Sequence, residues 1–68
     1  MKLYINGEER EVPASQTVET LLRALGIDPR KVAVERNLEI VPKSLYADIA
    51  VADGDRLEIV HFIGGGCL

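Results

Sequence analysis

Apolar and polar residues near the start of the chain alternate in a way that is typical of a β-hairpin. Leu3 and Ile5 alternate with polar positions, Asn6-Gly7 follows, and residues 8–12 continue the extended pattern. An Asn-Gly pair supplies the two positive φ angles that a tight hairpin turn requires. The sequence therefore predicts two antiparallel strands joined at residues 6–7.

The spacing of apolar residues changes after a connector at residues 13–16. Apolar residues now recur at intervals of three and four, at Val18, Leu21, Leu22 and Leu25. This spacing places them on one face of a helix that begins at Gln16 or Thr17. Gly26 supplies a left-handed residue at the C-terminal end of the helix, and Asp28-Pro29 prevents its continuation.

Strand-like alternation returns after the helix. Val32 and Val34 alternate with smaller or polar residues over residues 32–35, and a turn is expected near Asn37. Ile40-Val41 then forms a short apolar strand, which Pro42 ends because it has no N–H for a sheet hydrogen bond. These patterns predict a third and a fourth strand.

Residues 44–52 have no clear period. Their apolar residues fit either a long packed loop or a short helical turn. Asp53-Gly54-Asp55 is typical of a turn, and residues 56–63 form the last and most hydrophobic predicted strand. The first and last strands have the most β-branched and aliphatic residues, so we expect them side by side at the centre of the sheet.

One amphipathic helix can cover only one face of a small sheet, so the elements predict a two-layer α+β domain. Alternation places Leu57 and Ile59 on one side of the last strand. Val60 and Phe62 lie on the other side and, if the first pair packs on the helix, are exposed. With Ile63 they are candidates for docking a partner, although single exposed apolar residues are common on protein surfaces.

Composition and charge narrow the range of functions. The chain has 68 residues, enough for one domain, and a net charge of −3, which argues against nucleic acid or an anionic membrane as a partner. A basic protein surface suits it better. We expect no signal peptide and no membrane-spanning segment. The only cysteine, Cys67, cannot form an internal disulfide, which fits a cytoplasmic protein.

Few residues are candidates for chemistry. His61 is the only histidine, and we expect it to be a surface residue of the last strand. The carboxylates Asp53, Asp55 and Glu58 lie in or beside a turn, where binding of backbone groups is more common than acid–base catalysis. Without a second histidine or a cysteine cluster we expect no metal site. We also expect no bound cofactor and no catalysis by this chain alone.

The glycine run at residues 64–66 is the feature that most directly indicates a function. Glycines have no side chain to pack, so residues 64–68 are expected to form a flexible tail on a domain of residues 1–63. Three extended residues reach about 10 Å, enough to present a terminal carbonyl in a narrow channel of another protein. A terminus without a role is the alternative.

Three stretches, in order and spacing, resemble the ThiS family of sulfur carriers. They are Val32-Ala33-Val34-Glu35-Arg36-Asn37, Ile40-Val41-Pro42-Lys43-Ser44, and Asp53-Gly54-Asp55-Arg56-Leu57-Glu58-Ile59-Val60 leading to Ile63-Gly64-Gly65-Gly66. The resemblance covers essentially the whole chain. It implies a ubiquitin-like β-grasp fold, with a mixed sheet, parallel first and last strands, and one helix packed across one face.

The resemblance also implies a mechanism. An E1-like enzyme uses ATP to adenylate the carboxylate of Gly66, and sulfur then replaces AMP to give a thiocarboxylate, while Gly64 and Gly65 allow access to the activating site. Thiazole synthase is the implied sulfur acceptor in thiamine biosynthesis. A related carrier for homocysteine or methionine formation, or for another sulfur pathway, is the nearest alternative, and a ubiquitin-like modifier or docking module is an alternative of another class.

The sequence departs from the family ending at Cys67-Leu68, because these residues leave Gly66 in an amide bond. We expect a peptidase to cleave between Gly66 and Cys67. The less favoured alternative is that the thiol of Cys67 attacks the carbonyl of Gly66 and forms a thioester by an N-to-S shift.

Overall fold

The computed structural model describes residues 1–61, and the following element bounds refer to that part of the chain. The strands are β1 (Lys2–Ile5), β2 (Glu8–Glu11), β3 (Val32–Arg36), β4 (Glu39–Val41) and β5 (Arg56–His61). The helix α1 spans Val18–Ala24, and two short 3₁₀ helices, η1 (Pro29–Lys31) and η2 (Lys43–Leu45), precede β3 and follow β4. The predicted tail at residues 64–68 lies outside the described residues.

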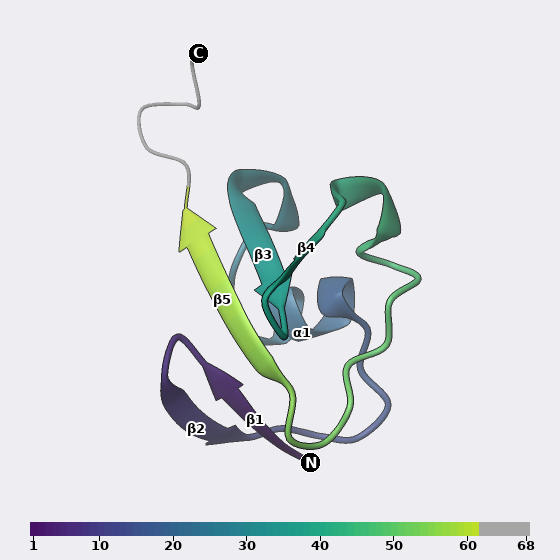
Figure 1. The fold of residues 1–68 in the computed structure, drawn as a ribbon. Coiled ribbons are helices and arrows are strands. Elements are labelled where there is room, and N and C mark those ends of the chain that lie inside the picture. Colours follow the sequence, from purple (N-terminus) through teal and green to yellow (C-terminus); the bar gives the residue numbers. More distant parts are fainter. Residues whose placement is uncertain (62–68) are drawn as a thin grey trace.

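All five strands form one sheet in the order β2-β1-β5-β3-β4. β1 and β5 pair in parallel, and the β1–β2, β3–β4 and β3–β5 pairs are antiparallel. Figure 1 shows β5 between its two neighbours, running from the end of the molecule that holds the N-terminus toward the opposite end. The mixed sheet and single helix confirm the predicted β-grasp arrangement, including the parallel first and last strands.

Two hairpin turns use residues with positive φ. Asn6 (φ 51°) and Gly7 (φ 83°) join β1 to β2, as the Asn-Gly pair predicted. Asn37 (φ 52°) and Leu38 (φ 72°) join β3 to β4, which confirms the turn expected near Asn37. Leucine is uncommon in this region of backbone space, and no motif predicted that Leu38 adopts it.

Local hydrogen bonds define both ends of α1. Thr17 is the N-terminal cap: its hydroxyl accepts from the Thr20 amide at 3.2 Å, and its own amide donates to the Thr20 hydroxyl at 2.8 Å. At the other end Gly26 has φ 76°, and the Ile27 amide donates to the Leu22 carbonyl at 2.9 Å. The predicted helix is therefore confirmed, with Thr17 rather than Gln16 as its cap and Leu25 just beyond its last turn.

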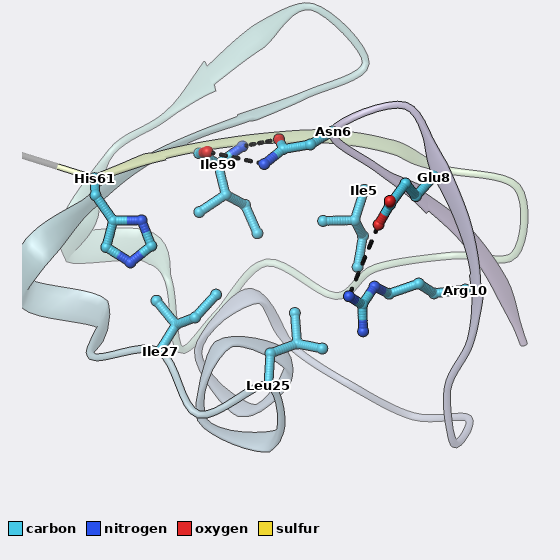
Figure 2. Close-up of a pocket in the computed structure, with 8 residues that line it drawn as sticks. All are labelled: Ile5, Asn6, Glu8, Arg10, Leu25, Ile27, Ile59 and His61. Atoms are coloured by element: carbon cyan, nitrogen blue, oxygen red, sulfur yellow. Dashed lines mark hydrogen bonds and ion pairs between the residues drawn. The ribbon is translucent and has the colours of Figure 1, made fainter.

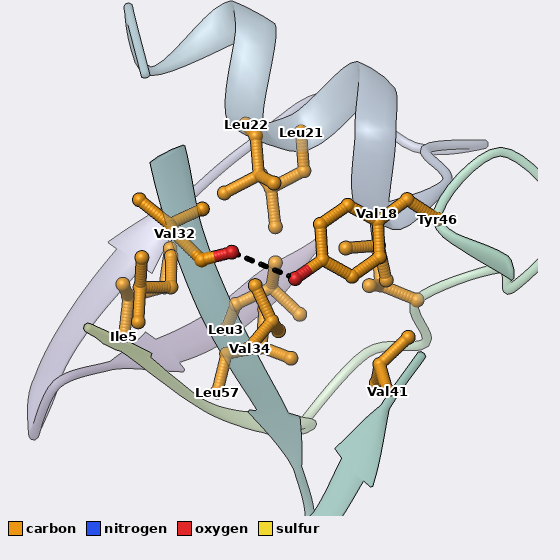
Figure 3. Packing of buried hydrophobic residues seen from close by; sticks show 12 residues of the cluster. Leu3, Ile5, Val18, Leu21, Leu22, Val32, Val34, Val41, Tyr46 and Leu57 are labelled. Atoms are coloured by element: carbon orange, nitrogen blue, oxygen red, sulfur yellow. Dashed lines mark hydrogen bonds between the residues drawn. The ribbon is translucent and has the colours of Figure 1, made fainter. Parts of the chain in front are cut away.

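The core lies between α1 and one face of the sheet (Figure 3). Its buried apolar members are Leu3, Ile5, Val18, Leu21, Leu22, Val32, Val34, Val41, Tyr46, Val51, Leu57 and Ile59. The helix contributes three of these positions with the predicted spacing. Within residues 1–61 no helix covers the other sheet face, as expected from a single amphipathic helix.

The ambiguous stretch contributes a core residue that the sequence analysis missed. After η2, Tyr46 is buried, and its hydroxyl donates to the Val32 carbonyl at 3.0 Å (Figure 3). Val51 is also buried, and Ile49 packs against the core. This part of the chain thus combines both expected alternatives, a short helical turn followed by a packed loop.

Across residues 1–61, none of the helices has the length and apolar character to cross a membrane.

Candidate functional site

Strand β5 carries the described part of the candidate site. It holds Val60 and ends at His61, immediately before the other predicted functional residues. Those residues, Phe62, Ile63, Gly64, Gly65, Gly66 and Cys67, lie outside the described part of the chain. The structure therefore shows the base from which the glycine segment continues.

The two sides of β5 have different environments. Leu57 and Ile59 face the helix and are 1% and 6% exposed, whereas Val60 is 60% exposed. Val60 lies opposite Ala33 of β3 on the face of the sheet without a helix. The predicted orientation is confirmed for these three residues. Docking by Val60 remains a prediction, and the orientation of Phe62 lies outside the described residues.

A buried carboxylate fixes the start of β5. Asp55 accepts hydrogen bonds from Arg36 Nε at 2.7 Å, from Asn37 Nδ2 at 3.1 Å and from the Ala52 amide at 2.7 Å. Burial, the largest influence, raises the pKa of Asp55, but the hydrogen bonds from Ala52, Arg36 and Asn37 together outweigh it, so the pKa is lowered from 3.8. The carboxylate thus links the turn before β5 to the β3–β4 hairpin.

The other two candidate carboxylates have separate roles. Asp53 accepts from the Lys2 amide at 2.7 Å and joins the same turn to the start of β1. This confirms the predicted turn-stabilising role for Asp53, as the network above does for Asp55. Glu58 is different, because it lies within β5, directly opposite Glu35 of β3.

Asn6 holds the open edge of β5, a role that the sequence analysis missed. Regular pairing with β1 ends at Ile5 and Leu57. Beyond it, Asn6 Oδ1 accepts from the Ile59 amide at 2.7 Å, and Asn6 Nδ2 donates to the Ile59 carbonyl at 3.2 Å. The side chain thereby replaces a neighbouring strand. Its local signal, an Asn before Gly, indicated only the turn.

A cleft of about 180 Å³ lies beside the end of β5, between the β1–β2 hairpin and the end of α1. Leu25, Ile27 and Ile59 give it apolar walls. In Figure 2 His61 faces Ile27 across one end, while Glu8 and Arg10 lie at the other. His61 was expected on the surface, and it is exposed at the cleft rim. The volume is below the roughly 300–1,000 Å³ of typical small-molecule sites, so the cleft suits a single side chain of a partner.

The polar side chains that hold β5 are bonded to other groups of the domain. Within residues 1–61 no three His, Cys, Asp or Glu residues gather in a way that could hold a metal ion. Asp55, a candidate carboxylate, accepts bonds from Arg36, Asn37 and Ala52, and the side chain of Asn6 bonds to both backbone groups of Ile59. The arrangement can hold β5 in place while one of its sides stays open to a partner.

Comparison with known proteins gives a consistent result. Residues 3–66 match the ThiS family. The sulfur carrier protein ThiS of Bacillus subtilis is 38% identical over 65 residues, which cover 94% of this chain and 98% of that protein. The crystal structure of the thiamine biosynthesis protein ThiS from Geobacter metallireducens superposes with a TM-score of 0.84 at 36% identity, covering 97% of this chain and 100% of that one.

A longer relative is also similar. A protein of Paramagnetospirillum magneticum named thiazole synthase is 76% identical over 66 residues. The match covers 97% of this chain but 20% of that protein, so the chain spans about a fifth of the relative's length. Most of the relative therefore has no counterpart among these 68 residues.

Proposed function

The chain belongs to the ThiS family, and from this membership we propose that it is a sulfur carrier in thiamine biosynthesis. It acts as a co-substrate of other enzymes, consumed and recharged in each cycle, and has no turnover of its own. Its site is the carboxylate of Gly66. The supporting observation is that the family match runs through the glycine segment and its last residue is Gly66.

The chemistry proceeds in two steps at the Gly66 carboxyl carbon. A carboxylate oxygen attacks the α-phosphorus of ATP on an E1-like adenylating enzyme, and pyrophosphate leaves. A sulfur nucleophile then attacks the acyl carbon, and AMP leaves with the electron pair of the broken C–O bond. With hydrosulfide as that nucleophile, loss of its proton leaves Gly66 ending in a thiocarboxylate. Gly64 and Gly65 contribute the absence of side chains, which allows entry into a narrow site.

A free carboxylate at Gly66 requires cleavage of the Gly66–Cys67 bond. In the 68-residue sequence this carbon is part of an amide, which ATP-dependent activation cannot use. We propose that a peptidase hydrolyses this bond. The reactions use ATP and other enzymes, so we place the carrier in the cytoplasm.

Thiazole formation is the proposed destination of the sulfur. The similarity to a relative named thiazole synthase, over almost the whole of this chain, favours it over homocysteine or methionine formation. An enzyme that takes sulfur from Gly66 must approach the end of β5. Val60 lies on this strand, so we propose that it contacts the enzyme. A ubiquitin-like modifier would instead join Gly66 to a lysine of a target protein.

The proposal is tested by charging the protein in vitro. One form ends at Gly66 and another retains Cys67-Leu68, and each is incubated with the adenylating enzyme of the same organism, ATP and a sulfur source. Intact-mass spectrometry should show one oxygen replaced by sulfur in the Gly66-ended form alone. A matched control ending at Gly65 keeps the same domain with a shorter tail, and we expect little or no charging.

Three results would contradict this function. Equal charging of the 68-residue chain and the Gly66-ended form would rule out Gly66 as the activated carboxylate. No charging of either form by any such enzyme of the organism would favour a docking module. Detection of Gly66 joined to lysine, without a thiocarboxylate, would identify a modifier.

A further inference from the structure

One edge of β5 is left open near the end of the strand. β1 pairs with β5 only at Arg56 and Leu57, and Asn6 then bonds to the amide and the carbonyl of Ile59. Backbone groups alternate between the two edges of a strand, so those of His61 are directed to the same edge as those of Ile59. Within residues 1–61 no strand pairs with His61 on that edge. An edge of this kind accepts an added strand.

The cleft beside this edge has space for one apolar side chain. It encloses about 180 Å³, and the partly buried Leu25 and Ile27 line it together with Ile59. Figure 2 shows His61 directed toward Ile27 across the space between the strand and the residues that follow α1. A strand added opposite His61 therefore brings a side chain directly above these apolar walls.

We infer that in the 68-residue chain the open edge and the cleft receive residues 66–68 of the same molecule, with Gly64-Gly65 as a two-residue turn and the side chain of Leu68 in the cleft. The contact itself goes beyond sulfur transfer. Its role, which is to delay cleavage between Gly66 and Cys67, rests on the proposed function.

The register of β5 selects the position of the turn. A two-residue turn joins the carbonyl of the residue before it to the amide of the residue after it, here Ile63 to Gly66. By strand alternation residue 63 uses the same edge as His61, and that is the open edge. A turn one residue later would use the backbone groups of Gly64, on the edge that β3 occupies. The Gly-Gly pair also suits the two positive φ angles that such a turn requires.

The same register brings Leu68 to the cleft. Counting outward from the turn pairs Phe62 with Cys67 and His61 with Leu68. Directly opposed residues of neighbouring strands carry their side chains on the same face of the sheet. Leu68 therefore lies beside His61 on the helix-facing side, where it covers the exposed parts of Leu25 and Ile27.

This contact links cleavage of the chain to delivery of the glycine segment. In the paired form the bond between Gly66 and Cys67 lies against β5, so a peptidase cuts it only in the fraction of molecules in which the pairing is open. A short added strand is marginally stable, and that fraction is therefore not small. Cleavage removes Leu68 and with it the cleft contact. The flexible tail expected from the glycine run is then a property of the Gly66-ended form.

The first experiment compares the 68-residue chain with the Gly66-ended form by NMR. The His61 amide gains a partner only in the longer chain, so its hydrogen exchange should be about three- to tenfold slower there. The Ile59 amide is bonded to Asn6 and serves as the internal control, which should agree between the two forms within about twofold. The methyl groups of Ile27 should change their chemical shifts and show contacts with those of Leu68.

Matched valine variants of the 68-residue chain test the turn. Gly65→Val places a β-branched residue at a positive φ, so His61 exchange should return to the rate of the Gly66-ended form. Gly66→Val places the same side chain at an extended position and should keep the slow exchange. Carboxypeptidase A then measures access, with Leu68 followed by intact mass. It should remove Leu68 about three- to tenfold faster from Gly65→Val than from the wild type or Gly66→Val.

The outcomes distinguish this inference from the proposed function. Equal His61 exchange in the 68-residue and Gly66-ended forms overturns the inference, and so do equal effects of Gly65→Val and Gly66→Val. An Ile27 shift that grows with protein concentration overturns it too, because a second copy would then supply the segment. Charging of the Gly66-ended form decides the proposed function separately. If that form is never charged while His61 exchange follows the expected pattern, the contact stands and its role before sulfur transfer is lost.

Discussion

The helix-facing and outer sides of β5 perform different tasks with the same backbone. Leu57 and Ile59 are almost fully buried against the core, whereas Glu58 and Val60, their neighbours in sequence, are exposed. Strand alternation alone produces this separation. The outer side can therefore change its contacts with a partner with little effect on folding, whereas the helix-facing side cannot.

Both sides depend on how β5 is held. Its start is fixed by Asp55, and its open edge by Asn6. The Asp55 contacts lie in the turn before β5, and the Asn6 contacts are made to the backbone of β5. Neither set depends on the side chains of the two faces of the strand. We therefore expect the buried side, the contacts of Asp55 and Asn6, and the outer side to contribute independently to the free energy of unfolding.

The largest effect is expected for Ile59→Ala. Removal of a buried side chain leaves a cavity, so the variant should lose about 2–5 kcal/mol of unfolding free energy. Val60→Ala is the matched control on the outer side and should change stability by less than about 0.5 kcal/mol. Melting curves of both variants test this, and similar losses would show that the two sides are not separate.

Asp55→Asn should rank second. The amide cannot accept all three hydrogen bonds as a carboxylate does, so we expect a loss of about 1–3 kcal/mol near neutral pH. The pKa of Asp55 is lowered from 3.8, so its contribution is present above that value and is lost as the pH falls through the folded-state pKa.

Denaturant unfolding measured from neutral to acidic pH tests the Asp55 prediction. The difference between wild type and variant should be largest at neutral pH and shrink below pH 3.8. A difference that stays constant over this range would mean that the charge of Asp55 does not stabilise the start of β5.

Asn6→Gly should have a smaller effect. Glycine keeps the positive φ of the turn but removes both side-chain hydrogen bonds to Ile59, which should cost about 1–2 kcal/mol. Amide exchange should accelerate more at Ile59 than at Leu3 in the neighbouring strand. Equal acceleration at both sites would indicate a global effect rather than loss of a contact at the open edge.

The smallest effect on stability is expected for Val60→Ser. The side chain is already exposed, so stability should change by less than about 0.5 kcal/mol, while binding to the adenylating enzyme weakens. Phe62→Ser should behave similarly, a prediction that concerns a residue outside the described part of the chain. Calorimetric titration measures the binding, and melting curves measure the stability. A clearly lower melting temperature for Val60→Ser, or binding as tight as that of the wild type, would contradict this prediction.

Some features were predictable because their signals are local. Asn6-Gly7 specified the first hairpin, and the spacing of Val18, Leu21 and Leu22 specified the helix and its buried face. The sides of β5 followed from alternation. The sequence did not predict the structure of residues 44–52 in the same way. Tyr46 and Val51 enter the core from a loop whose side chains follow no period.

The sequence by itself determined the kinds of elements, the family and the glycine segment through residue 66, because backbone preferences and motif spacing act over short stretches. Only the tertiary structure decided that Asn6 bonds to Ile59, 53 residues away, and that Glu35 lies opposite Glu58. Both contacts depend on strand order and register. Those are fixed when the whole core packs, since shifting a strand by one residue would turn its buried side outward.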